Sequence, residues 1–204
     1  MSSTFGRPVL FNGEMVKAIL NNQKTETRRP IKGLAGREIS HWHTISTGEL
    51  SRPRGHDGEF VSGSVRSPFG RVGGLLYVRE TFCPRANGMM RLEKIQTPFY
   101  RATDAKDPKP ASWPWRPSIH MPTWAARIWL RVDSVRVERL QCIDTASAMR
   151  EGVSKHPHKA IADFSAVWDS IYGKREGLDS AADPWVWVAR FSVASTTGRA
   201  EVAR

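Results

Sequence analysis

Apolar residues recur at helical spacing in two parts of the chain. Between residues 12 and 22 they form i,i+4 pairs on one face, which predicts a helix that Asn12 caps and that ends at Asn21 and Asn22. A second helix is predicted around residues 161–171, where apolar residues are spaced i, i+3, i+7 and i+10. Between these two, Asp144 is expected to cap a short helix that Gly152 ends.

Other segments have the composition or the alternation of β-strands. They are residues 9–11, 75–80, 99–101, 128–137 and 185–191. In residues 128–137 the apolar positions change phase beside Asp133 and Ser134, which predicts a bulge or a tight turn there.

The order of these elements shows no regular alternation of strand and helix, so a doubly wound parallel sheet is not expected. A mostly antiparallel barrel with helices packed outside fits better, which places the chain in the α+β class. Residues 33–74 are rich in Gly, Ser, Pro and Arg without a sustained period, and they predict a long loop insertion. We therefore expect a single domain over residues 7–193, followed by a flexible tail at 194–204.

Composition and charge narrow the possible functions. The 204 residues carry 31 Lys and Arg against 20 acids, a net charge of +11, which favours a polyanion such as nucleic acid as partner. No apolar stretch is long enough to span a bilayer and no signal peptide is recognised, so no membrane partner and a cytoplasmic location are expected.

Metal and cofactor chemistry find little support in the sequence. The two cysteines lack the C-x-x-C spacing, which argues against a disulfide scaffold and a thiolate zinc site. His41 and His43 have no carboxylate or cysteine at a convincing distance, and solvent-facing histidines explain them better. No phosphate-binding loop is found, and no metal or organic cofactor is implied.

The residues that stand out are the basic run Lys24 to Arg29, directly after the first helix. From residue 17 to residue 37, Glu26 is the only acid among six Lys and Arg residues. Such a stripe suits phosphates, although a solvated basic face is an equal alternative.

This run resembles the signature of the ASCH family, Gly-x-Lys-x-x-(Glu or Thr)-x-Arg after a helix. Lys24, Thr27 and Arg29 fill three of its positions, while Asn22 stands in place of the glycine and tolerates the same positive φ. Further segments resemble a longer ASCH subgroup common in bacteriophages and prophages, and the resemblance covers most of residues 7–192.

The resemblance implies a PUA-like barrel and a protein that handles RNA or a modified nucleoside, with DNA as a further possible partner. It also implies a hydrolase hypothesis, because a small bacterial member removes the acyl group of N4-acetylcytidine. In that pattern Lys24 is the base, Thr27 the nucleophile and Glu151 the acid. The alternatives are a ribonuclease, a binding module without catalysis, and a phage accessory protein that grips a host protein.

The hydrolase hypothesis makes physical demands on these residues. Lysine serves as a base only if its pKa is lowered, and Arg28 and Arg29 act in that direction. Residues 24 and 27 point to opposite faces of a straight strand, so the chain must bend between them.

Three further residues are candidates for ligand contact or for ordinary structural roles. Arg79 and Glu80 end a strand, and they either line the cleft or form an ion pair with each other. His120 either contacts the ligand or packs against the backbone. Together with Arg28 and Arg29, these complete the predicted binding residues.

Overall fold

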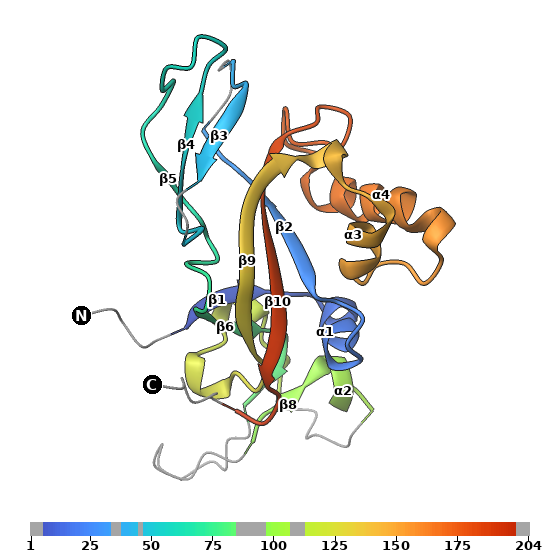
Figure 1. Cartoon of the computed structure of the whole chain (residues 1–204). Helices are drawn as coiled ribbons and strands as arrows, with labels where there is room; N and C mark the ends of the chain where they lie inside the picture. Colours follow the sequence, from blue (N-terminus) through green and yellow to red (C-terminus); the bar gives the residue numbers. More distant parts are fainter. Residues whose placement is uncertain (1–5, 34–37, 45–46, 85–96, 107–112, 199–204) are drawn as a thin grey trace, which may run out of the picture. The chain divides into compact units, whose positions relative to one another are not determined.

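The computed structural model describes residues 6–33, 38–44, 47–84, 97–106 and 113–198 (Figure 1). By its internal contacts the chain divides into two compact units, each built from segments far apart in the sequence. Unit 1 contains residues 1–21, 75–130 and 193–204, and unit 2 contains residues 22–74 and 131–192. Of the tail expected at 194–204, residues 194 and 195 continue a strand, and residues 199–204 lie outside the described residues.

Unit 1 contains the first helix and a parallel strand pair. Strand β1 (Arg7–Leu10) runs parallel to β6 (Leu75–Arg79), with Val9 opposite Val78 and both residues buried. The short strands β7 (Phe82–Cys83) and β8 (Phe99–Tyr100) form an antiparallel pair. Short helical elements complete this unit: α2 (Arg101–Asp104), η2 (Ser118–His120) and η3 (Thr123–Ala125).

Helix α1 (Gly13–Leu20) has the cap that the sequence predicts. The Asn12 side chain accepts a hydrogen bond from the Met15 amide at 2.9 Å, which satisfies one of the free N–H groups at the start of the helix. Val16 and Ile19 are fully buried on its inner face. After the helix, Asn22 takes a positive φ of 56°, a backbone conformation that Asn adopts more readily than most residues other than glycine.

Unit 2 has an antiparallel strand pair against which two helices pack (Figure 1). Strand β2 (Glu26–Pro30) pairs with β10 (Trp185–Ser195), with Thr27 opposite Ala189. Helices α3 (Thr145–Arg150) and α4 (Ala160–Tyr172) share a core with β10 that includes Phe164, Trp168 and Val186. The 3-10 helices η4 (Leu140–Cys142) and η5 (Pro157–Lys159) precede these two helices.

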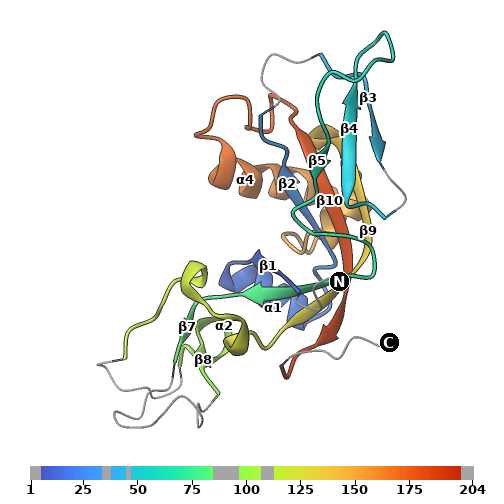
Figure 2. The ribbon, with the colours of Figure 1, turned by 90° about the vertical axis from the view of Figure 1, so that its left-hand side faces the viewer.

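The stretch expected as a loop contains a small sheet, so that expectation is corrected. Strands β3 (His41–Thr44), β4 (Leu50–Arg54) and β5 (Val65–Arg66) form a three-stranded antiparallel sheet with β4 in the middle (Figure 2). The sheet was not predicted because its strands are short and mostly polar. In addition, β4 contains Pro53, and a proline in a sequence argues against a central strand. Its buried residues, Ser51 and Pro53, lie on one face, the face that also carries the half-buried Trp42.

The strands and helices confirm the α+β class. The larger sheet has five strands in the order β1-β6-β9-β10-β2, where β9 (Trp129–Arg139) and β10 each contribute residues to both units. Within the described residues this sheet is open, with β1 and β2 as its edge strands, and closure into a barrel is not seen. Strand β9 passes Asp133 and Ser134 without a turn, while its buried positions change phase from Val132 to Val135. No helix in the described ranges is both long and apolar enough to span a membrane.

Candidate functional site: a buried ion network around Lys24

Backbone hydrogen bonds join the basic motif to the end of helix α3 and to strand β10. The Thr25 amide donates to the Arg150 carbonyl at 2.8 Å, and the Thr25 carbonyl accepts from the Phe191 amide at 2.9 Å. Asp144 caps the start of α3 by accepting from the Ser147 amide at 2.6 Å, and Glu151 follows the last residue of the helix. These bonds place Lys24, which precedes β2, against Glu151 at the C-terminus of α3.

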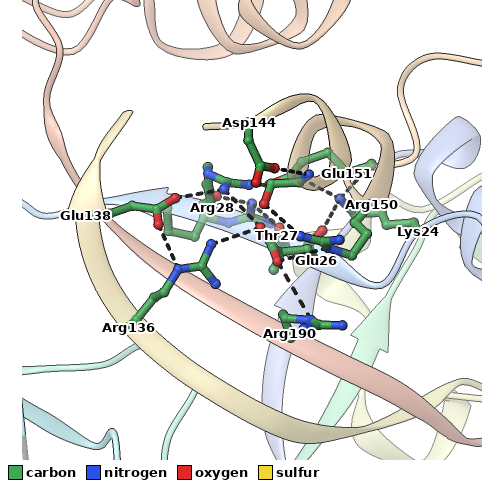
Figure 3. A network of polar contacts seen from close by, with 12 residues as sticks. Lys24, Glu26, Thr27, Arg28, Arg136, Glu138, Asp144, Arg150, Glu151 and Arg190 are labelled. Atoms are coloured by element: carbon green, nitrogen blue, oxygen red, sulfur yellow. Dashed lines mark hydrogen bonds and ion pairs between the residues drawn. The ribbon is translucent and has the colours of Figure 1, made fainter. Parts of the chain in front are cut away.

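Lys24 and Glu151 form a buried ion pair (Figure 3). The Lys24 ammonium donates to Glu151 Oε2 at 2.7 Å, to the Glu151 carbonyl at 2.9 Å and to the Glu26 carbonyl at 2.8 Å. An ammonium group has three protons, and these three acceptors use all of them. Lys24 is 0% exposed and Glu151 is 3% exposed, so water does not screen this pair.

Arg28 connects this pair to two further carboxylates. Its Nη1 donates to Glu151 Oε1 at 3.0 Å, and its Nη2 lies 2.9 Å from Glu26 Oε1 and 2.8 Å from Glu138 Oε1. The guanidinium also lies over the ring of Phe164, at 5.6 Å from its centroid. Arg28 therefore ties β2, β9 and α3 together through charge-assisted hydrogen bonds.

Three further arginines surround the carboxylates of this network (Figure 3). Arg136 contacts Glu138 at 2.7 Å and Glu26 at 3.3 Å, while Arg150 and Arg190 lie 3.4 Å and 3.9 Å from Glu26 Oε2. Glu26, which is 0% exposed, is thus in contact with four guanidinium groups. Within unit 2, the carboxylates of Glu26, Glu138 and Glu151 thus compensate the positive charges of Lys24 and Arg28.

The burial and the charges shift two pKa values in the network. Burial lowers the pKa of Lys24, with Arg29 and Arg28 acting in the same direction and Glu151 opposing them. Burial acts to raise the pKa of Glu26, but the guanidinium groups of Arg28, Arg136 and Arg150 outweigh it and lower that pKa. The lowered pKa of Lys24 is the direction that the hydrolase hypothesis requires, although burial is a larger cause than the neighbouring arginines.

The structure thus brings Lys24, Arg28 and Glu151 together, and it places Thr27 and Arg29 beside them on β2. Thr27 is 1% exposed, and its hydroxyl accepts a hydrogen bond from Arg29 Nη1 at 3.0 Å. Arg29 is half-buried and also donates to the Arg28 carbonyl at 2.7 Å. The catalytic roles assigned to Lys24, Thr27 and Glu151 stay predictions.

The remaining predicted residues lie in unit 1. Glu80 is buried, and it pairs with Arg127 through two hydrogen bonds of 2.9 and 3.0 Å rather than with its neighbour Arg79. Burial raises the pKa of Glu80, and the guanidinium of Arg127 opposes that rise. Arg79 donates to the Ile119 carbonyl, and His120 is exposed in η2.

An open cavity of about 400 Å³ lies in unit 2 beside the Lys24–Glu151 pair. The residues next to the pair in sequence, Thr25 and Arg150, both contribute to its wall. The full lining consists of Asn22, Gln23, Thr25, Met149, Arg150, Ser154 and Lys155. No carboxylate belongs to this lining, so the cavity is cationic.

Sequence reasoning missed five residues of the network: Glu26, Arg136, Glu138, Arg150 and Arg190. A lone acid within a basic stretch was the available signal for Glu26. Arg136 and Glu138 alternate on β9 and therefore share one face of that strand, yet the same spacing is common on solvated surfaces. The partners of these two residues on β2, Arg28 and Glu26, are 110 positions away in the sequence, which no local pattern reveals.

Comparison with known proteins adds little to this geometry. No family model matches the chain, and no curated protein matches it. A crystal structure of a protein from Enterococcus faecalis V583, described under the family model DUF984, aligns with 97% of this chain and 86% of its own. The two chains are 9% identical and the TM-score is 0.40, a similarity that supports no argument about function.

Proposed function

We propose that this chain is an ASCH-type protein that binds RNA or a modified nucleoside, and that the cavity beside Lys24 and Glu151 receives the nucleoside. The observation that carries the proposal is the cavity itself. Its volume of about 400 Å³ falls in the range of small-ligand sites, roughly 300–1,000 Å³. Part of its wall comes from the segment that resembles the ASCH signature.

The lining offers the contacts that a nucleotide requires. Arg150 and Lys155 provide positive charge for a phosphate, and the amides of Asn22 and Gln23 can donate to and accept from the edge of a base. Met149 supplies apolar surface for the face of a base. Lys155 is exposed and forms no ion pair within the described part of the chain, whereas Arg150 also contacts Glu26 and Ser147. We therefore assign the main phosphate contact to Lys155.

The geometry favours binding over catalysis. A general base needs a free lone pair within reach of the proton that it removes, and Lys24 donates all three of its protons to fixed acceptors. Thr27, which would have to attack the substrate, is almost fully buried. The buried network then acts as the support that holds the cavity wall in place.

Hydrolysis of an N4-acylated cytidine is the second candidate. It is favoured by the lowered pKa of Lys24 and by the direct contact between Lys24 and Glu151. For turnover, Lys24 would have to release Glu151 and take the proton of the Thr27 hydroxyl. The Thr27 oxygen would then bond to the acyl carbon, the C–N bond would break, and cytidine would leave with a proton delivered by Lys24 or Glu151. Water would hydrolyse the resulting ester, which releases the carboxylic acid and restores the Thr27 hydroxyl. A lid or strand movement would be needed to expose these groups.

Calorimetric titration with cytidine 5′-monophosphate and with cytidine tests the binding proposal. We expect saturable binding of both ligands. Lys155→Gln should weaken the affinity for the nucleotide about fivefold, or about 1 kcal/mol, and leave the affinity for the nucleoside unchanged. Lys174→Gln removes an equivalent exposed charge outside the cavity lining, so it should change neither of these affinities. Absence of saturable binding to both ligands would contradict the proposal.

Incubation with N4-acetylcytidine, followed by chromatography, separates the two candidates. Thr27→Val removes the hydroxyl while keeping the shape, and Thr27→Ser keeps the hydroxyl as the matched control. Cytidine formed by the wild type and by Thr27→Ser, but not by Thr27→Val or Lys24→Ala, would establish hydrolysis. No cytidine from the wild type would leave the binding module as the function.

A further inference from the structure

The small sheet of β3, β4 and β5 has two chemically different faces. Because directly paired residues point to the same side, His41 and Arg54 share one face, as do His43 and Arg52. Arg66 on β5 joins them, since it pairs with Leu50 on β4. We call this the cationic face; its charged and titratable residues are His41, His43, Arg52, Arg54 and Arg66.

The opposite face fixes the orientation of the sheet. Trp42 pairs with the buried Pro53, and its ring meets that of Trp185 edge-on at 5.9 Å between centroids. On the same side, Thr44 and Ser51 form a hydrogen bond of 2.6 Å between their hydroxyls. A register shift by one residue would move Trp42 into solvent, so the cationic face is held outward.

An exposed aromatic ring orders the arginines of the cationic face. Phe60, which bridges to Arg54 from the next segment, lies 3.8 Å from Arg52 Cζ and 4.2 Å from Arg54 Cζ, measured to the ring centroid. Arg54 also donates to the Gly58 carbonyl at 2.6 Å. Within the described ranges, neither Arg52 nor Arg54 forms an ion pair with a carboxylate, so their charge is available to a ligand.

We propose that the cationic face binds single-stranded nucleic acid. Phosphates would contact Arg52 and Arg54, while Arg66 already pairs with Glu49 at 3.4 Å and adds less charge. Bases would stack on the guanidinium planes and the imidazole rings, which are flat surfaces without sequence preference. The combination of ordered arginines with an aromatic ring fits bases as well as phosphates, whereas an acidic protein would need only the charge. This proposal does not depend on the cavity and concerns a different surface of unit 2.

Fluorescence anisotropy with a labelled 12-nucleotide RNA at several salt concentrations tests it. Each phosphate contact contributes about 0.7 to the slope of log affinity against log salt for a single strand. We therefore expect the double variant Arg52→Gln/Arg54→Gln to lower the magnitude of the slope by about 1.4 and the affinity by about tenfold at low salt. Lys174→Gln/Arg175→Gln is the matched control: it removes the same charge, and Arg175 also lies over an aromatic ring, that of Tyr172.

Two further measurements separate nucleic acid from other polyanions. An abasic strand with the same phosphates should bind more weakly than the RNA, and Phe60→Leu should reduce this difference. Equal binding of the abasic strand, or equal competition by polyglutamate, would overturn the proposal in favour of an acidic partner. Equal losses in the two double variants would also overturn it.

The outcome is distinguishable from that of the cavity experiment. The Arg52→Gln/Arg54→Gln variant should still bind cytidine 5′-monophosphate like the wild type. Circular dichroism on the same samples checks that the substitutions at the exposed Arg52 and the half-buried Arg54 leave the fold intact. Loss of RNA binding together with retained nucleotide binding would support this face specifically.

Discussion

Replacing Glu151 by glutamine tests whether the buried network is held together by charge. Its carboxylate accepts from Lys24 at 2.7 Å and from Arg28 at 3.0 Å, and its side chain is 5% exposed. The substitution keeps the shape but leaves two buried cations facing one amide oxygen and one NH₂ group. Removal of one partner from a buried ion pair costs about 3–5 kcal/mol, because the remaining charge is neither solvated nor compensated.

This cost is measurable by urea unfolding and by thermal melting. For a chain of this size, 1 kcal/mol corresponds to roughly 2–4 °C, so Tm should fall by roughly 6–20 °C. Glu14→Gln is the control, since Glu14 pairs with Lys17 at 2.9 Å but its side chain is 84% exposed. That change should cost less than about 1 kcal/mol.

The pH dependence of the variant gives a second readout. Without Glu151, the pKa of Lys24 falls further below its unfolded value, so the folded protein binds fewer protons than the unfolded chain. The stability of Glu151→Gln should therefore rise with pH, up to the unfolded pKa of about 10.4, more steeply than that of the wild type. A loss below about 1 kcal/mol with no added pH dependence would refute the assignment of a charged, compensated network.

Three further predictions concern neighbouring features. Because the pKa of Glu26 is lowered in the folded state, its ionised carboxylate stabilises the fold above the unfolded pKa of about 4.5, and this contribution is lost as pH falls through the folded pKa. In urea unfolding between pH 6 and 3, the free energy of unfolding of Glu26→Gln should therefore depend less on pH than that of the wild type. Asp144→Ala should lower the free energy of unfolding by about 1 kcal/mol, because it removes the cap of α3, while Asp144→Asn should keep most of it. Burial raises the pKa of Tyr100 to about 12, with Arg127 opposing, so absorbance titration should show one late tyrosine that Tyr100→Phe removes; ionisation of all three tyrosines near pH 10 would contradict it.

The sequence predicted the local features of the fold because local physics determines them. Asn12 and Asp144 cap helices with their own side chains, and Asn22 has the positive φ that its position after a helix suggests. The helix predicted around residues 161–171 from its apolar spacing is present as α4; of its four periodic apolar residues, Phe164 and Trp168 are buried, whereas Ile161 and Ile171 are exposed. Periodicity therefore located the helix better than it identified its buried face.

The small sheet and most of the ion network were not predictable in the same way. Residues 41–44 and 50–54 alternate, but their buried positions are Ser51 and Pro53, and Trp42 is half-buried, so no apolar pattern marks the inner face. The contact between Lys24 and Glu151 joins residues 127 positions apart, and it was anticipated only through the resemblance to the ASCH family. Long-range ion pairs depend on tertiary structure, and charge alone does not distinguish them from surface residues.

Photocrosslinking tests the central claim most directly, namely that a nucleoside occupies the cavity beside Lys24 and Glu151. The protein would be irradiated with an RNA that carries 4-thiouridine, and the adducts would be mapped by mass spectrometry. The account predicts adducts on residues 22–25 and 149–155, which excess cytidine 5′-monophosphate suppresses. Crosslinks that spare both segments, or that excess nucleotide does not suppress, would contradict it.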